Sequence, residues 1–427
     1  MQTLTVYNQH VLQALKQIPD NSVDCIITSP PYYGLRSYKG ADTIWGGDPN
    51  CEHDFEIREH HTQGQSDKAT TESPIKGLEK NWKEGFCSKC GAWKGQLGLE
   101  PTYQMYIDHL LTVTAELKRI LKPSGTLFWN MGDSYAGKMG KRQGWNDNKI
   151  SYTREEALEN GTTFYLNADY GNIQNKSLMM IPERFAIAMI DQGWILRNKI
   201  IWFKRNGIPT STKDRLANKW EYIFFFVKSK KYFFNLDTIR KPLADPDRML
   251  RGVSGKRYSQ SEAIEAFFGN PHHGINKPRP NVKHNMNLNI ENYLSKGANP
   301  GDVINTPAIR YKSWYSNPGH KFTHEREYDP NADGSDFWDI PTKPHTFAHF
   351  AVFPETLVEP LIKAGCPQNG VVLDPFAGSG TTLLVALNHG LDAIGIEISK
   401  EYIPIIETRT NAKERQKLGT LDYRLIV

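Results

Sequence analysis

The chain has 427 residues, of which 39% are hydrophobic and 23% charged, and this length suits one large α/β domain with insertions. It shows no signal-peptide pattern and no apolar run of membrane-spanning length, so a secreted or membrane-spanning protein is not expected. A formal net charge of +5 is modest for a nucleic-acid binder, and the composition agrees with an intracellular enzyme.

The first motif follows the sequence SVDCII (Ser22 to Ile27), whose pattern predicts a buried parallel strand. The sequence TSPPY occupies 28–32. Its two prolines fix φ and favour extended backbone, so we expect a rigid loop at the carboxyl edge of the strand. Open α/β sheets bind ligands at that edge. The alternative is a Pro-Pro turn before an aromatic core residue.

The five cysteines fall into two groups. Cys25 and Cys366 are interpreted as packing thiols. The other three join a histidine in a CxH…CxxCG pattern that suits a closed tetrahedral zinc site: Cys51, His53, Cys87 and Cys90. His60 and His61 are alternatives to His53. We expect structural Zn²⁺ to hold together an insertion that has few apolar residues.

The middle of the chain alternates predicted helices and strands. Helical spacing of apolar residues predicts a helix over Tyr103 to Leu121, followed by the strand TLFWNM at 126–131. A second helix is expected from about Pro182 to Gly193, then the strand ILRNKIIWF. The sequence YIFFFVKSKKYFF at 222–234 predicts a hairpin. A polar stretch at 138–177 interrupts the alternation and is expected to be a mobile loop.

A basic stretch without clear periodicity follows. Residues 240–323 contain thirteen Lys or Arg against six Asp or Glu, together with many Asn, Pro, Gly and His residues. One interpretation is a solvated linker. The other is a nucleic-acid-binding region, in which basic side chains supply affinity for phosphates.

The last motif is DPFAGSGTT at 374–382. It follows the apolar run VVLD and precedes a helical pattern that ends at Gly390; a second strand, AIGIEIS, then carries Glu397. A strand, a glycine turn, a helix, a strand and an acid about twenty residues on form the pattern of nucleotide-cofactor loops, in which the acid binds ribose hydroxyls.

The two motifs together resemble the amino-group DNA methyltransferases, which make N4-methylcytosine or N6-methyladenine with S-adenosylmethionine. With SPPY first and the glycine loop last, the order is similar to that of their permuted β class. The resemblance runs over four blocks: NQHVLQALKQIPDNSVDCIITSPPY, EPTYQMYIDHLLTVTAELKRILKPSGTLFWNMGDSY, GWILRNKIIWFKRNGIPTSTKDRLANKWEYIFFFVKSKKYFF, and HFAVFPETLVEPLIKAG before VVLDPFAGSGTT. One departure is Gln9-His10 in place of the usual Gly-Asp, so a carboxylate expected near the cofactor is absent.

The resemblance implies an α/β fold with a permuted Rossmann-like methyltransferase sheet, mostly parallel with an antiparallel edge hairpin, and a target-recognition region; the cysteine pattern adds a small zinc-binding insertion. The expected parts follow in chain order: the start of the catalytic half with the SPPY loop at 1–45, the zinc insertion at 46–98, the continued catalytic sheet at 99–239 with the mobile loop 138–177 able to close over DNA, target recognition and DNA binding at 240–344, and the cofactor-binding half at 345–427.

Methylation of an exocyclic amine explains the residue types of the SPPY loop. The nitrogen lone pair is delocalised into the base until its hydrogens are held out of the ring plane. The Ser29 hydroxyl and the Pro30 carbonyl can accept those hydrogens, and the rigid Pro30-Pro31 corner keeps both acceptors in place. Tyr32 is the expected stacking surface for a flipped base. Tyr33 is a second stacking candidate or, alternatively, a core residue.

The resemblance also assigns binding residues. The cofactor is S-adenosylmethionine, and its ligands would be Asp374, Phe376, Gly378, Ser379, Gly380, Thr381 and Glu397. Phe376 is alternatively a core residue, and Thr381 and Thr382 alternatively cap a helix. Basic residues beside the catalytic edge are candidate DNA contacts or solvated charges: Arg36, Lys204, Arg205, Lys213 and Arg215.

These observations predict site-specific methylation of double-stranded DNA, with N4 of cytosine favoured because adenine enzymes more often carry DPPY. The alternatives are an N6-adenine enzyme, an RNA or protein methyltransferase on the same fold, and an inactive zinc-containing DNA-binding protein. A homodimer and a cognate restriction endonuclease are left open as partners, and no membrane partner is expected. The expected location is the cytoplasm of a bacterium or archaeon, or of a phage host, in association with the nucleoid.

Overall fold

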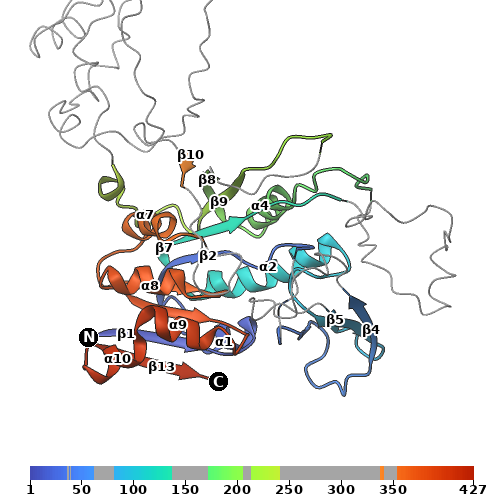
Figure 1. Ribbon diagram of the computed structural model, residues 1–427, viewed down its shortest axis with the longest axis horizontal. Coiled ribbons are helices and arrows are strands. Elements are labelled where there is room, and N and C mark those ends of the chain that lie inside the picture. Colours follow the sequence, from blue (N-terminus) through green and yellow to red (C-terminus); the bar gives the residue numbers. More distant parts are fainter. Residues whose placement is uncertain are drawn as a thin grey trace, which may run out of the picture. The chain divides into compact units, whose positions relative to one another are not determined.

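The structure is a computed structural model that describes residues 1–35, 38, 40–61, 81–136, 172–204, 213–240, 337–340 and 353–427 (Figure 1). The chain forms two compact units, one made of Met1–Phe234 with Ile340–Val427 and the other of Asn235–Asp339. In the second unit the structure describes the 3₁₀ helix η1 (Leu236–Ile239) and the strand β10 (Phe337–Asp339). Most of the predicted target-recognition region, 240–344, and most of the loop 138–177 fall outside the described residues.

A mixed sheet forms the centre of the first unit, with the strand order β8-β9-β7-β2-β11-β12-β1-β13. The strands are β1 (Gln2–Tyr7), β2 (Val23–Thr28), β7 (Leu121–Met131), β8 (Ile195–Phe203), β9 (Trp220–Val227), β11 (Val371–Asp374), β12 (Asp392–Ile396) and β13 (Leu421–Ile426). Every pair from β7 to β13 is parallel, whereas β9 is antiparallel to both of its neighbours. This topology confirms the predicted mostly parallel sheet.

The predicted hairpin at 222–234 is wrong in its second half. Only the first part is a strand, β9, and its antiparallel partners are β7 and β8. Residues Tyr232 to Phe234 are not a strand, and the Phe233 N–H donates to the Ser124 carbonyl at 2.8 Å. The antiparallel β9 therefore lies between β7 and β8.

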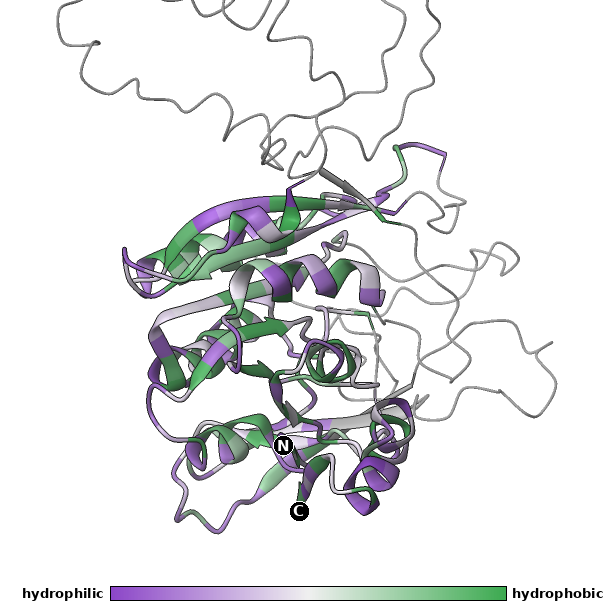
Figure 2. Ribbon diagram, turned by 90° about the vertical axis from the view of Figure 1, so that its left-hand side faces the viewer, coloured by the Kyte–Doolittle hydropathy of each residue, from purple (hydrophilic) through white to green (hydrophobic). Residues whose placement is uncertain are grey.

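Helices pack against this sheet in two groups. Helices α1 (Val11–Lys16), α2 (Tyr103–Ile120) and α4 (Ile181–Asp191) contact one another in that order. Helices α7 (Glu355–Gly365), α8 (Thr381–Asn388) and α9 (Ile403–Thr410) form a second group, seen in orange and red in Figure 1, and α10 (Ala412–Lys417) follows. Many helices are hydrophobic along one side and hydrophilic along the other (Figure 2), as expected for helices that cover a core.

The two long predicted helices are confirmed. In α2, the Thr102 side chain accepts a hydrogen bond from the Met105 N–H, and a buried stripe that includes Ile107, Leu110 and Leu117 faces the core. The following strand begins at Leu121, five residues earlier than predicted. No helix within the described residues combines the length and apolarity needed to cross a membrane.

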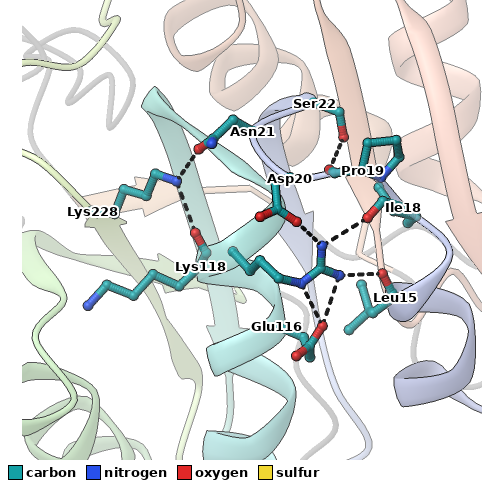
Figure 3. A network of polar contacts seen from close by, with 10 residues as sticks. Leu15, Ile18, Pro19, Asp20, Asn21, Ser22, Glu116, Lys118 and Lys228 are labelled. Atoms are coloured by element: carbon teal, nitrogen blue, oxygen red, sulfur yellow. Dashed lines mark hydrogen bonds and ion pairs between the residues drawn. The ribbon is translucent and has the colours of Figure 1, made fainter.

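A cluster of polar contacts fixes the turn that leads into β2 (Figure 3). Arg119 on α2 donates to the carbonyls of Leu15 at 2.8 Å and Ile18 at 3.1 Å, and it also pairs with Asp20 and Glu116. All six residues of β2 are buried. The strand that precedes SPPY is therefore fixed at its N-terminal end by these contacts and buried along its whole length.

The region of the predicted zinc insertion forms a small antiparallel sheet with the order β3-β6-β5-β4. Its strands are β3 (Thr43–Trp45), β4 (Phe55–His61), β5 (Asn81–Cys87) and β6 (Trp93–Gly95). Trp45 and Trp93 are buried in the main hydrophobic core of the first unit. The small sheet therefore packs onto the main core through these two tryptophans.

Candidate active site

The two sequence motifs meet on neighbouring parallel strands. In the β2–β11 pair, Cys25 lies opposite Val372 and Ile26 opposite Leu373, so both strands end at the same edge. There the Thr28 hydroxyl donates to the Asp374 carboxylate at 2.7 Å. The SPPY loop thus lies at the carboxyl edge of the sheet, as predicted, and the structure places the glycine loop beside it.

Asp374 joins the strand, the loop and the helix of the glycine motif. It is 2% exposed and accepts hydrogen bonds from the Phe376 N–H at 3.1 Å and the Thr382 hydroxyl at 2.8 Å. Burial raises the pKa of its carboxyl to about 6, against the opposing effect of these hydrogen bonds and that from Thr28. Asp374 therefore fixes the conformation of the glycine loop through hydrogen bonds to the loop itself and to the following helix.

The prediction that Thr381 and Thr382 cap the following helix is wrong. The N-cap of α8 is Gly380, at φ +77°, and no side chain caps the helix. The Thr382 hydroxyl donates to Asp374, and the Thr381 hydroxyl accepts from Arg409 at 2.8 Å. Both hydroxyls hold the loop to other parts of the fold.

A hydrogen bond connects Gly378 in the glycine loop with Glu397, which follows β12. Gly378 has φ +51°, and its N–H donates to one carboxylate oxygen of Glu397 at 2.8 Å. The other oxygen accepts from the Ser399 N–H at 2.8 Å. Burial raises the pKa of Glu397 to about 7. The buried Ser399 hydroxyl lacks a hydrogen-bond partner within the described chain, so a polar ligand beside Glu397 would have a group to bind.

Phe376 contacts the core on one side. Its ring stands edge-on to Trp129, with the centroids 6.3 Å apart, and it packs against the main core cluster while remaining partly exposed. This position is compatible with both of the roles predicted for it.

Arg409 on α9 is a site residue that the sequence did not indicate. It donates to the Ser379 carbonyl at 3.0 Å, the Ser379 hydroxyl at 2.7 Å and the Thr381 hydroxyl at 2.8 Å, and it pairs with Glu355 at 3.3 Å. Its side chain is 8% exposed, and burial lowers its pKa. Arg409 thus fixes the far side of the glycine loop, about thirty residues from the motif in sequence.

The SPPY loop is held by tyrosine hydroxyls. Tyr106 on α2 donates to the Pro31 carbonyl at 2.7 Å. Tyr33 is buried, and its ring lies 5.6 Å from that of Tyr106, so it takes the core role that was one of its two predicted roles. Tyr32 remains partly exposed; the Ser29 hydroxyl donates to its oxygen at 3.2 Å.

Two residues missed by the sequence analysis contact the Tyr32 hydroxyl. It lies 3.0 Å from Asn130 Oδ1 on β7 and 2.9 Å from Glu221 Oε2 on β9. Burial and the neighbouring Glu221 carboxylate raise the pKa of Tyr32. No local motif marks either residue, because each reaches the loop only through strand pairing.

His10, which stands where the family usually has aspartate, docks the small sheet. Its ring is edge-on to Trp45 at 4.6 Å between centroids, and Trp45 stacks on His109 at 4.7 Å. Burial, with His109 nearby, lowers the pKa of His10 to about 4. The contact with the cofactor-side residue Glu397 is made by Asn8, two residues before His10: its side-chain amide donates to the Glu397 carbonyl at 2.8 Å.

The predicted metal ligands come together. Their ligand atoms all lie within 4.8 Å of one another: Cys51, His53, Cys87 and Cys90. Cys51 Sγ is 3.9 Å from Cys87 Sγ, and Cys90 Sγ is 3.3 Å from His53 Nδ1. In the β4–β5 register His60 lies opposite Trp82, five pairs from Cys87, a backbone separation of about 17 Å.

The other two cysteines, Cys25 and Cys366, are buried free thiols, as predicted. Burial raises the pKa of Cys25 to about 12.

The candidate DNA contacts have different surroundings. Arg36 and Arg205 lie outside the described residues. Lys204 forms an ion pair with Glu221 and lies over the Trp202 ring at 4.3 Å. Lys213 and Arg215 are exposed, and the Arg215 guanidinium lies 3.7 Å over the Tyr135 ring.

Comparison with known proteins gives matches over nearly the whole chain. A family model described as DNA methylase, N6_N4_Mtase, matches residues 23–408. The type II methyltransferase M.XycI of Xanthomonas campestris pv. cyanopsidis is 27% identical, over 95% of this chain and 87% of its own length. The type II methyltransferase M.SfiI of Streptomyces fimbriatus is 27% identical, over 95% and 91%. A solved structure of the cytosine-N4-specific PvuII DNA methyltransferase aligns over 98% and 95%, with 14% identity and a TM-score of 0.46.

Proposed function

We propose that this chain, which belongs to the N6_N4_Mtase family of DNA methylases, methylates N4 of cytosine within a short specific sequence of double-stranded DNA. At the level of the family it is an S-adenosylmethionine-dependent methyltransferase that acts on an exocyclic amine of DNA. The observation that supports the proposal is the Thr28–Asp374 hydrogen bond, because it connects the SPPY loop, to which we assign amine binding, with the glycine loop.

The residues of the glycine loop fit the cofactor. Gly378 has a positive φ and no side chain, so its backbone could approach a bound cofactor closely. The Glu397 carboxylate could accept hydrogen bonds from ribose hydroxyls. The Ser399 hydroxyl, which has no hydrogen-bond partner among the residues that the structure describes, adds a polar group beside Glu397. When bound, S-adenosylmethionine supplies an electrophilic sulfonium methyl group. The other predicted ligands belong to the same loop: Asp374, Phe376, Ser379, Gly380 and Thr381.

The SPPY loop would prepare the amine. We propose that the Ser29 hydroxyl and the Pro30 carbonyl accept the two amine hydrogens and so free the nitrogen lone pair for attack. The next carbonyl, of Pro31, is held by Tyr106. Tyr32 would stack on the flipped base with its partly exposed ring. The ring is also packed against backbone, because a Cβ on Gly132 would lie 2.8 Å from it.

The choice of cytosine rests on SPPY, since adenine enzymes more often have DPPY. We expect N4-methylcytosine in DNA from cells that express the chain, measured by nucleoside mass spectrometry with DNA from cells carrying the empty vector as control. N6-methyladenine would overturn the choice of base and keep the family, and the absence of both marks from substrate DNA incubated with purified, folded protein and cofactor would overturn the proposed function.

We also propose that Cys51, His53, Cys87 and Cys90 bind one structural zinc ion. Tetrahedral zinc with thiolate bonds of about 2.3 Å implies sulfur atoms about 3.8 Å apart. The Cys51–Cys87 sulfur separation of 3.9 Å agrees with this geometry. Four protein ligands close the site, so its role would be to fix the small sheet.

Elemental analysis of protein purified without added metal is expected to give one zinc per chain. The Cys90→Ser variant should lose the ion, because three remaining ligands no longer close a tetrahedron. The matched control is Cys366→Ser, which makes the same chemical change at a buried thiol in another part of the fold. A zinc-free wild-type protein of full stability would contradict the proposal.

The DNA-binding role of 240–344 stays a prediction, supported by the basic excess in 240–323. Among the candidate contacts, Lys213 and Arg215 are exposed and available to phosphates. A homodimer and a cognate endonuclease likewise stay predictions.

A further inference from the structure

A chain of hydrogen bonds connects the SPPY serine to an ion pair located after the end of β8 and at the start of β9. The Ser29 hydroxyl contacts the Tyr32 hydroxyl at 3.2 Å, and the Tyr32 hydroxyl contacts Glu221 at 2.9 Å. Glu221 in turn forms an ion pair with Lys204. Neither member of this pair belongs to the SPPY or glycine motifs. Lys204 is a candidate DNA contact, and the amine chemistry proposed above uses neither residue.

The strand arrangement explains how Glu221 reaches the loop. Because β9 is antiparallel to β7, its first residues lie beside the carboxyl end of β7, where Met131 is opposite Tyr222. Close packing fixes the contact, since a Cβ on Gly132 would lie 2.8 Å from the Tyr32 ring and 3.2 Å from Glu221 Oε1. The tyrosine and the carboxylate therefore have little freedom to separate.

The chemistry of the neighbours sets the direction of each hydrogen bond. Asn130 Nδ2 donates to the Tyr222 carbonyl at 2.9 Å, which turns Asn130 Oδ1 toward Tyr32. The Tyr32 hydroxyl thus faces two acceptors, the Asn130 oxygen and the Glu221 carboxylate, and its one proton must point toward them. Its lone pairs are left for Ser29, so the Ser29 hydroxyl must donate to Tyr32.

We infer that Glu221, with Lys204, is a positioning residue that acts through Tyr32 to make Ser29 a hydrogen-bond acceptor toward the target base. This inference rests on the proposed function and deepens it. A serine hydroxyl has one proton and two lone pairs, and committing the proton to Tyr32 leaves only lone pairs for a ligand. The site therefore selects a base that presents an amine hydrogen at this point and rejects one that presents a carbonyl oxygen.

Glu221→Gln tests the inference, because a glutamine amide can donate to Tyr32 and reverse the whole chain of hydrogen bonds. We expect kcat for DNA methylation to fall about 10-fold or more, with unchanged affinities for cofactor and DNA. Tyr32→Phe keeps the stacking ring but removes the connecting hydroxyl, so it should give a similar loss. Glu183→Gln is the matched control: Glu183 pairs with Lys199 at 3.3 Å outside this network, and its kcat should stay at the wild-type level.

A double-mutant cycle with Ser29→Ala separates positioning from a general structural effect. If Glu221 acts through Ser29, Ser29→Ala/Glu221→Gln should be no slower than Ser29→Ala alone. Losses that multiply, or single variants within twofold of the wild type, would overturn the inference and leave the proposed function standing. A wild-type protein that methylates no base would overturn both.

Discussion

Gly378→Val is expected to abolish S-adenosylmethionine binding while the protein stays folded. Gly378 has φ +51°, a conformation that a β-branched residue adopts only with strain, so the loop must change shape. That change would also break the hydrogen bond from the Gly378 N–H to Glu397 and move the carboxylate that we assign to the ribose. Calorimetric titration of the purified variant with the cofactor measures the effect, and circular dichroism monitors folding.

The control for this experiment is Gly390→Val at the other end of the same helix. Gly390 also has a positive φ, +78°, but a Cβ there would meet only open space. It imposes comparable backbone strain away from the glycine loop, so its cofactor affinity should stay near that of the wild type. Wild-type affinity in the Gly378 variant would refute the assignment of the cofactor site.

Ser29→Ala is expected to reduce kcat by about 10²-fold or more, with little change in cofactor affinity. Loss of a single preorganised hydrogen-bonding group at a reacting centre typically has an effect of this size. Cofactor affinity should be preserved because the residues assigned to the cofactor lie on the β11 and β12 side of the sheet. Turnover on DNA under saturating cofactor, together with direct titration, separates the two quantities.

Ser22→Ala is the matched control, since Ser22 lies at the opposite end of the same strand and donates to the Pro19 carbonyl at 2.6 Å. It should keep wild-type turnover. An unchanged kcat in Ser29→Ala would remove the serine from the proposed chemistry, and equal losses in both variants would point to a general effect on β2.

Much of the fold could be predicted from local patterns. The strand patterns before SPPY and before the glycine loop are strands β2 and β11, and helical spacing located α2 within a residue of its end. These predictions succeeded because burial selects apolar residues in recognisable patterns: helical spacing in α2 and short, mostly apolar stretches in the buried strands. The hairpin at 222–234 failed because two aromatic runs around a lysine-rich turn resemble one, whereas strand pairing is decided by distant residues.

The site divides in the same way. SPPY, the glycines and the metal ligands carry local spacing that indicates their chemistry, and the structure brings each set together. Arg409 and Glu221 have ordinary neighbours in sequence, and their contacts arise only when α9 meets the glycine loop and β9 meets β7. The supposed helix caps Thr381 and Thr382 were misassigned because Gly380 had already turned the backbone into the helix.

The pairing of β2 with β11 also has a consequence for synthesis on the ribosome. Thr28 and Asp374 are 346 residues apart, which corresponds to roughly 20 to 70 s of translation at about 5–20 residues per second. Strands β2, β7, β8 and β9 are made well before β11, so during this interval β2, whose residues are all buried in the folded protein, would present an unpaired edge to other nascent chains. Misassembly and a need for chaperones should therefore be greatest at this edge, until the glycine motif emerges and covers it.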